Sequence, residues 1–300
     1  MNQSQPHPQV QPSGLPAALT AYFIWGFMPL YLLLVKSVPP PEFVGWRIIW
    51  TLPLCLVIVA LRKQWPDLRR ALADWRSLAF LTASAILIAI NWLLYVWAIQ
   101  SNQVYAASLG YYINPLVNVL LGTVVLGERL SRLQWAAVAI AALGIALLLG
   151  GALDALWISL TLAFSFGAYG LLRKQVPAGA LPGLTIESAI LLLPAAGIAM
   201  YYAAGPNGSA FFQSPELSLS IMLGGALTAF PLLLFAIAAR RMDYSTLGFT
   251  QFLAPTIVFV LALTVFKQPL EPVKLACFIL IWIAIGLFSW DLLQRRSKTA

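Results

Sequence analysis

The 300-residue chain is poor in charge: only 9% of its residues are charged, against roughly 25% in an average soluble domain. Hydrophobic residues make up 61% of the sequence, which is more apolar surface than a soluble core of this size can hide. We therefore expect a lipid bilayer to cover it. The net charge of +8 does not indicate a nucleic-acid partner, because the basic residues are scattered between apolar stretches.

Side chains that usually carry catalysis or bind metals are also scarce. The one histidine, His7, lies in a Pro- and Gln-rich tail, residues 1–14, which we expect to be disordered. Cys55 and Cys277 each stand alone in an apolar stretch, which excludes a disulfide framework and any metal-binding spacing. The chain contains no G-x-S-x-G motif and no phosphate-binding loop. The sequence thus predicts no catalytic residues, no metal and no cofactor, and an intramembrane enzyme is the weaker alternative.

Long apolar stretches dominate the chain, and crossing a bilayer requires about 20 such residues. They predict an all-α integral membrane protein with about ten transmembrane helices. Residues 65–75, which begin and end with Trp, are expected to form a short interfacial helix. The ten predicted spans are residues 15–35, 43–61, 77–99, 104–127, 133–153, 155–172, 180–204, 217–239, 244–266 and 275–290.

The distribution of Lys and Arg predicts the orientation in the membrane. Fourteen basic residues, Arg173 among them, fall in the loops after the second, fourth, sixth and eighth spans and in the C-terminal tail. Only Lys36, Lys267 and Lys274 fall on the other side. Both termini are therefore predicted to be cytoplasmic.

The two halves of the chain resemble each other at an offset of 140 to 141 residues. We expect five-helix repeats at 15–153 and 154–292, followed by a cytoplasmic tail at 293–300. Because five is odd, the repeats would cross the membrane in opposite directions, as in many secondary transporters. Pro115 and Pro255 correspond to each other and are expected to break the fourth and ninth helices. Other matches are Leu19, Thr20, Phe23, Gly26 and Pro53 with Leu160, Thr161, Phe164, Gly167 and Pro194.

Four stretches of the chain carry recognisable motifs. The longest is residues 91–135, which includes Gly-Glu-Arg-Leu at 127–130; shorter ones are AYFIWG at 21–26, residues 162–174 and residues 245–255. These motifs resemble the RarD-type branch of the EamA family, in the drug/metabolite transporter superfamily. The second repeat departs from the pattern, with Lys-Gln-Pro-Leu at 267–270. The resemblance implies a permease, and more narrowly an exporter, in a bacterial inner membrane, with a family label of chloramphenicol resistance.

Two charged residues within the predicted spans are candidates for function, because charge inside hydrocarbon is costly. Arg47 lies near the outer end of the second span, so it either extends to the headgroups or faces the solute. Glu187 is either a buried acid bonded to neighbouring helices or a protonatable group that couples transport to protons. The depths of the two residues in their spans do not favour a direct pair between them.

Aromatic and amide side chains form a second group of candidates. Tyr111, Asn114 and Asn118 share one face of the fourth span, at i, i+3 and i+7. One interpretation is interhelical hydrogen bonding and aromatic packing. The other is a wall of the substrate pathway, completed by Tyr22, Trp25, Asn91, Tyr95 and Gln251.

Such a wall would suit a small, neutral or zwitterionic, partly apolar solute. The expected function is therefore a secondary transporter, and a passive facilitator or channel is the alternative. The expected partners are the bilayer and the solute, with proton coupling as an option and no nucleic acid. The solute, the coupling ion, the direction of transport and the oligomeric state are not specified by the sequence.

Overall fold

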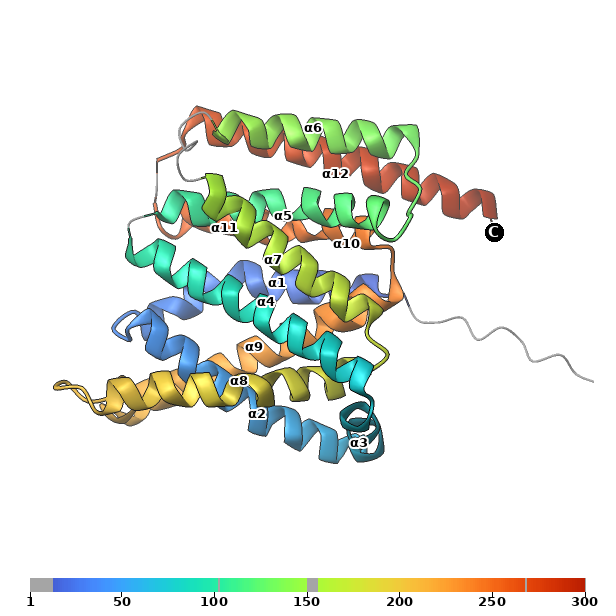
Figure 1. Cartoon of the computed structure of the whole chain (residues 1–300). Coiled ribbons are helices and arrows are strands. Elements are labelled where there is room, and N and C mark those ends of the chain that lie inside the picture. The colour runs from blue at the N-terminus through green and yellow to red at the C-terminus, as the bar shows by residue number, and fades with distance from the viewer. Residues whose placement is uncertain (1–12, 102, 150–155, 268, 300) are drawn as a thin grey trace, which may run out of the picture.

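The computed structural model describes residues 13–101, 103–149, 156–267 and 269–299, which form a bundle of helices (Figure 1). No strand occurs in these ranges. Within the described residues, eight helices are long and apolar enough to cross a membrane, judged by length and composition. The prediction of an all-helical, multi-pass membrane protein is therefore confirmed. The predicted disordered tail falls mainly on residues 1–12, which lie outside the described ranges.

The helices follow the predicted stretches closely. The eight candidate spans are α1 with its 3-10 extension, α2, α4, α7, α8, α9, α10 with α11, and α12, while α6 is a shorter apolar helix. The first half contains α1 (Leu15–Leu32), η1 (Leu33–Val35), α2 (Pro40–Leu61), α3 (Trp65–Ala73), α4 (Trp75–Gln100), α5 (Val104–Val124) and α6 (Arg132–Leu149). The second half contains α7 (Leu156–Gln175), α8 (Ala180–Ala203), η3 (Ala210–Phe212), α9 (Pro215–Arg241), α10 (Tyr244–Gln251), α11 (Leu253–Thr264) and α12 (Pro272–Thr299).

Local sequence signals explain several helix ends. α1, α2, α3 and α9 begin with proline in the first turn, where its missing N–H costs nothing. The helix predicted at 65–75 is present as α3, and it ends before Asp74. Asp74 then caps α4, because its Oδ2 accepts hydrogen bonds from Ser77 N at 3.0 Å and Ser77 Oγ at 2.7 Å. The hydroxyl of Ser77 holds the pKa of Asp74 below its usual value.

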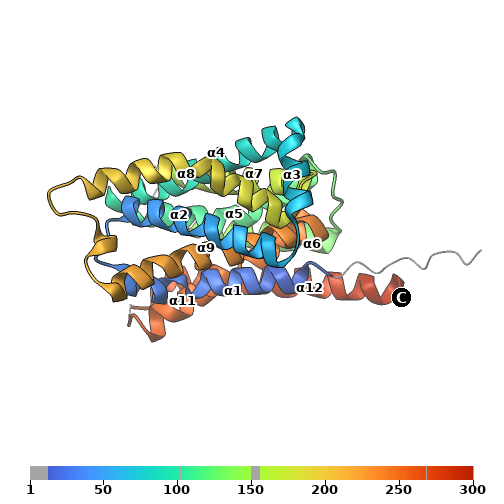
Figure 2. The ribbon, with the colours of Figure 1, turned by 90° about the horizontal axis from the view of Figure 1, so that it is seen from below.

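Both described ends of the chain lie at the same end of the bundle. Figure 1 shows the first turn of α1 and the last turn of α12 on one side, and the turned view in Figure 2 agrees. We call this side the termini end; α3 and the loops α5–α6, α7–α8 and α9–α10 also lie there. The loops α1–α2, α4–α5 and α8–α9 lie at the other side, which we call the opposite end. α6 and α12 pack together along one edge of the bundle.

Two turns at corresponding positions in the halves have the same backbone geometry. Gly127 follows α5 with a φ of 68°, and Lys267, 140 residues later, follows α11 with a φ of 53°. The carbonyl of Leu121 accepts hydrogen bonds from the amides four and five residues later, at 3.0 and 3.2 Å. The carbonyl of Leu261 does the same at 2.9 and 3.0 Å. The turn is thus repeated although the Gly-Glu-Arg-Leu motif is not.

The two prolines that were expected to break helices behave differently. α5 continues through Pro115, so the expected break there is absent. A proline removes one backbone hydrogen bond, and the remaining bonds of this 21-residue helix keep it continuous. In the second half the helix is interrupted at Phe252, between α10 and α11, and Pro255 lies in the first turn of α11. The amide of Phe252 bonds to Phe249 O, three residues back, at 3.3 Å.

Candidate solute-binding site

A cavity of about 520 Å³ lies among helices of both halves. Its wall runs from the middle of α7 and α9 and the last residue of α10 to the α1–α2 loop at the opposite end, where Lys36 and Val38 line it. This volume falls within the range of sites for small molecules, which is about 300–1,000 Å³. The site is therefore large enough for a metabolite-sized solute.

Most of the cavity wall is aromatic or aliphatic. Among the predicted pathway residues, the structure places Tyr22, Trp25, Tyr95 and Tyr111 in the wall. The rings of Tyr95 and Tyr111 meet edge to face, with centroids 5.7 Å apart. Further rings, which the sequence argument missed, come from Phe43, Trp92, Tyr112 and Phe166.

The predicted amide residues divide between the wall and the spaces between helices. Asn91 and Gln251 line the cavity, whereas Asn114 and Asn118 do not. Asn91 Nδ2 donates to Leu162 O at 2.8 Å, so it also holds α4 against α7. Asn114 Nδ2 donates to Ala163 O at 3.0 Å, and Asn118 Nδ2 donates to Gln251 Oε1 at 2.8 Å. The polar face of α5 therefore joins helices, and only its aromatic member reaches the cavity.

Arg47 also lines the cavity. Its guanidinium carbon lies 4.3 Å from the centre of the Trp92 ring, a cation–π distance. Its Nε is buried and has no hydrogen-bond partner. Among the described residues of the wall, the charged ones are Arg47 and Lys36, and none is an aspartate or glutamate.

Glu187 has a different partner from the one weighed on sequence. Its Oε1 lies 3.6 Å from Nη1 of Arg173, and the hydroxyl of Ser84 donates to the same oxygen. Arg173 and Glu187 are both buried, at 0% and 3% side-chain exposure. The assignment of Arg173 to a cytoplasmic loop was therefore wrong, because α7 continues to Gln175. Gly183 on α8 makes the room: a Cβ there would lie 2.0 Å from Nη1 of Arg173.

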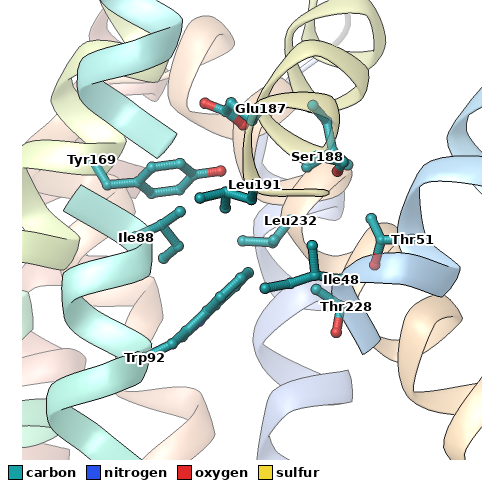
Figure 3. Close-up of a pocket in the computed structure, with 11 residues that line it drawn as sticks. Ile48, Thr51, Ile88, Trp92, Tyr169, Glu187, Ser188, Leu191, Thr228 and Leu232 are labelled. Carbon is teal, nitrogen blue, oxygen red and sulfur yellow. The ribbon is translucent and has the colours of Figure 1, made fainter. Parts of the chain in front are cut away.

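A small pocket separates this ion pair from the large cavity. Figure 3 shows Glu187 at one end of the pocket and Trp92 at the other, with Tyr169 reaching in from the side. Its volume of about 20 Å³ offers space for roughly one water molecule. Trp92, Thr228 and Leu232 line both spaces, so the pocket adjoins the cavity.

Comparison with known proteins gives the family. Residues 12–150 match the EamA-like transporter family. The chain is 43% identical to an uncharacterized transporter of Pseudomonas aeruginosa over 282 residues, 93% of each protein. It is 40% identical to protein RarD of Escherichia coli over 288 residues, 96% of this chain and 97% of that protein. The chain belongs to the EamA-like transporter family. It is a membrane transporter.

The fold of this EamA-family chain is also found in a solved crystal structure. That crystal structure superposes with a TM-score of 0.72 at 18% identity, covering 94% of this chain and 98% of that one. The family match at residues 12–150 ends close to residue 153, where the sequence predicts the end of the first repeat. The match to RarD covers both halves.

In this EamA-family chain, Glu128 of the Gly-Glu-Arg-Leu motif closes the termini end. Its carboxylate accepts hydrogen bonds from Tyr244 N at 2.6 Å, Ser245 N at 2.8 Å and Ser245 Oγ at 2.7 Å. These amides begin α10, where a negative group is favoured at the helix N-terminus. The motif thus attaches the loop after α5 to the start of α10.

Two basic residues connect α7 and α9 reciprocally at the termini end. Lys174 Nζ, at the end of α7, donates to Ala239 O at 3.0 Å and Met242 O at 2.7 Å. Arg240 Nη1, at the end of α9, donates back to Val176 O at 2.9 Å and also to Ala178 O. These bonds satisfy carbonyls that the helix ends leave free. Sequence analysis counted both residues only as markers of orientation.

The two halves approach each other closely where α10 crosses α5. A Cβ on Gly248 would lie 2.7 Å from Pro115 O and 2.9 Å from Cβ of Asn118, so only glycine fits. At the 140-residue offset, Gly248 corresponds to Ser108 and Pro115 to Pro255. Ser108 and Pro255 both line the cavity. One of two equivalent crossings is therefore packed, while the residues of the other face the cavity.

Glu42 is a buried acid that the sequence argument passed over, because it precedes the second apolar stretch. Its Oε1 accepts from Ala210 N at 2.9 Å, from Trp46 Nε1 at 3.3 Å and from Ser209 Oγ at 2.5 Å. Glu42 therefore fastens the α8–α9 loop to the start of α2. Nothing in the residue pattern around it signals this contact.

Proposed function

We propose that this transporter is a secondary carrier with ten spans in two inverted five-helix repeats, residues 15–153 and 154–292. It moves a small, partly apolar solute out of the cell through the central cavity. The termini end faces the cytoplasm of a bacterium, and the protein lies in the inner membrane. Export follows from the family resemblance, and the cytoplasmic side follows from the thirteen basic residues that remain at the termini end when the buried Arg173 is left out.

This proposal rests on a difference between two helix crossings that correspond to each other in the two halves. Gly248 packs on Pro115 at the termini side of the cavity, whereas Ser108 and Pro255 face the cavity on the other side. In an inverted repeat, exchanging the conformations of the halves would bring Ser108 to Pro255 and release Gly248 from Pro115. The cavity would then be accessible from the termini end, which is the alternating access of secondary transporters.

Glu187 is the proposed proton-coupling residue. It lies at the end of the small pocket that adjoins the cavity, so one water molecule could join it to the solute site. A proton on Glu187 would neutralise its carboxylate and leave the buried Arg173 without a countercharge. Protonation would therefore weaken the contact between α7 and α8 at the termini end. This links proton binding to the elements that close the cavity.

Transport by the purified chain in proteoliposomes tests the proposal. Accumulation of amino acids, small metabolites and chloramphenicol would be measured with and without an imposed proton gradient, against liposomes without protein. We expect uptake of a panel member to collapse when the gradient is dissipated, and Glu187→Gln to remove the dependence on the gradient.

Uptake that ignores the gradient in the wild type would instead identify a passive facilitator. Normal gradient-dependent uptake by Glu187→Gln, across a pH series and at normal expression, would remove Glu187 from the mechanism. Transport of no panel member in either orientation of the protein would count against the carrier itself.

A further inference from the structure

The cavity carries positive charge that no acid in its wall balances. Arg47 and Lys36 both line it, and the described wall contains no aspartate or glutamate. Arg47 forms no ion pair with any described residue, and its buried Nε has no hydrogen-bond partner. Its guanidinium rests on the face of Trp92. A partly buried guanidinium without a countercharge is costly, and a bound anion would reduce that cost.

The acids nearest to the site are already engaged elsewhere. Glu187 is paired with Arg173, so the two charges below the cavity cancel. Glu42, on the same helix as Arg47, accepts hydrogen bonds from Ser209 and Ala210. Positions 42 and 47 point about 140° apart on an ideal helix. Neither carboxylate is therefore placed to balance Arg47 or to receive a cationic group of the solute.

We propose that the solute is an organic monoanion: one carboxylate, or a similar acidic group, on an aromatic or apolar body. The acidic group bonds to Arg47, whose planar fork of donors matches a carboxylate. The body packs against the rings of Trp25, Tyr95, Tyr111 and Phe166. Lys36, where the cavity reaches the opposite end, adds a second positive charge along the path of the anion. This inference rests on the proposed function and narrows it, because the cavity was expected to suit a neutral or zwitterionic solute.

The absence of an acid from the described wall also separates a simple anion from an amino acid. An α-ammonium group needs acceptors when it leaves water, and a positively charged wall repels it. A zwitterion of the same shape would therefore bind more weakly than the acid that lacks the amino group. A cation of the same shape would bind least.

The test compares three probes that share a phenyl ring and a two-carbon spacer. At about pH 7, 3-phenylpropionate is an anion, phenylalanine is a zwitterion and phenethylamine is a cation. Binding to the full-length protein in detergent would be measured by isothermal titration calorimetry. We expect 3-phenylpropionate to bind at least about tenfold more tightly than phenylalanine, the scale of one charge-assisted hydrogen bond, and phenethylamine to bind least.

Three variants assign the preference to its residue. Arg47→Gln should bind the three probes with similar affinity, and Arg47→Lys should keep most of the preference for the anion. Lys274→Gln is the matched control: it removes one positive charge from α12, where Lys274 pairs with Glu271 outside the cavity. This variant should behave as the wild type does.

Equal or tighter binding of phenylalanine, or an anion preference that survives in Arg47→Gln, would overturn the inference. Binding of none of the probes would overturn it too, because the proposed class includes the first probe. The proposed function is tested separately in proteoliposomes. If 3-phenylpropionate binds through Arg47 but is not transported, the carrier proposal fails and the anion site stands. If panel solutes are carried without regard to their charge, the carrier proposal stands and the anion site fails.

Discussion

Arg173 on α7 and Glu187 on α8 form an ion pair at 3.6 Å, with both side chains buried. The guanidinium donates a hydrogen bond from its Nη2 to Ala180 O at 2.8 Å, and it packs against Gly183, which has no Cβ to displace it. The carboxylate also accepts a hydrogen bond from Ser84 on α4. Three helices therefore depend on one pair of charges just below the cavity.

Replacing Gly183 by alanine should destabilise the protein. The new Cβ would lie 2.0 Å from Nη1 of Arg173, so the guanidinium must leave Glu187. Breaking a buried pair costs roughly 3–5 kcal/mol. We expect a clearly lower Tm for Gly183→Ala when unfolding is followed in detergent. Gly197→Ala is the control on the same helix, because nothing lies within 4 Å of a Cβ there. Equal Tm values for the two variants would contradict the geometry.

The two charges should show strong coupling in a double-mutant cycle. Glu187→Gln leaves a buried Arg173 without countercharge, and Arg173→Gln leaves a buried carboxylate, so each single change should cost roughly 3 kcal/mol. The double variant removes both charges and should cost clearly less than the sum. Stability measured by chemical unfolding in detergent would give the coupling energy. Additive losses would show that the pair does not act as a unit.

Glu128→Ala should weaken the closure of the termini end. The change leaves Tyr244 N, Ser245 N and Ser245 Oγ without their shared acceptor at the start of α10. Loss of such a cap costs about 1–2 kcal/mol. Glu271→Ala removes an acid from an exposed pair with Lys274, so it should change Tm little. An equal effect of both substitutions on Tm would argue against the role of Glu128.

The two equivalent crossings should respond in opposite ways to added bulk. Leucine at Ser108 should keep the opposite end open, whereas leucine at Gly248 should force α10 away from Pro115 and open the termini end. Access of a reagent to the cavity can be measured with Ala254→Cys in the cavity wall. Cys55 and Cys277 are changed to serine so that only this cysteine reacts. Labelling from the opposite end with an impermeant maleimide should stay fast in Ser108→Leu and slow in Gly248→Leu.

Wild-type Ser108 and Gly248 in the same cysteine background give the reference rate. Slow labelling of Ser108→Leu, or fast labelling of Gly248→Leu, would contradict the exchange between the two crossings. Solute transport should be lost in both variants, because each one prevents one of the two states.

The helices were predictable because they follow from long apolar stretches, and each helix is a local structure. Trp25, Tyr95 and Tyr111 were also predictable as wall residues, because aromatic residues and helix position can be read from sequence. The partner of Glu187 was not predictable. Arg173 stands at the end of an apolar stretch, and such a residue is normally exposed. Arg173 is buried because α8 packs over it, with Gly183 against the guanidinium, and this contact is visible only in the structure.

The sequence also did not show which amide side chains line the cavity and which ones join helices. Asn114 and Asn118 lie on the helix face predicted for them, but that face meets α7 and α10 instead of the cavity. Helical periodicity gives the residues that share a face and does not give the neighbour of that face. In the same way, Pro115 could not be distinguished from Pro255, although only the second half has an interrupted helix.

In the described part of the chain, the reciprocal bonds of Lys174 and Arg240 have no counterpart at the opposite end, because at the 141-residue offset Lys174 corresponds to the apolar Leu33. The two access states of the empty carrier therefore differ in free energy, although the halves share a fold. The apparent affinity of a solute from one side is its intrinsic affinity multiplied by the population of carriers accessible from that side. A single binding site would thus show weak affinity from the cytoplasm and stronger affinity from outside. For an exporter, this tighter outward affinity favours the recapture of released solute, so recapture stays slow only while the outside concentration is below the tighter of the two dissociation constants.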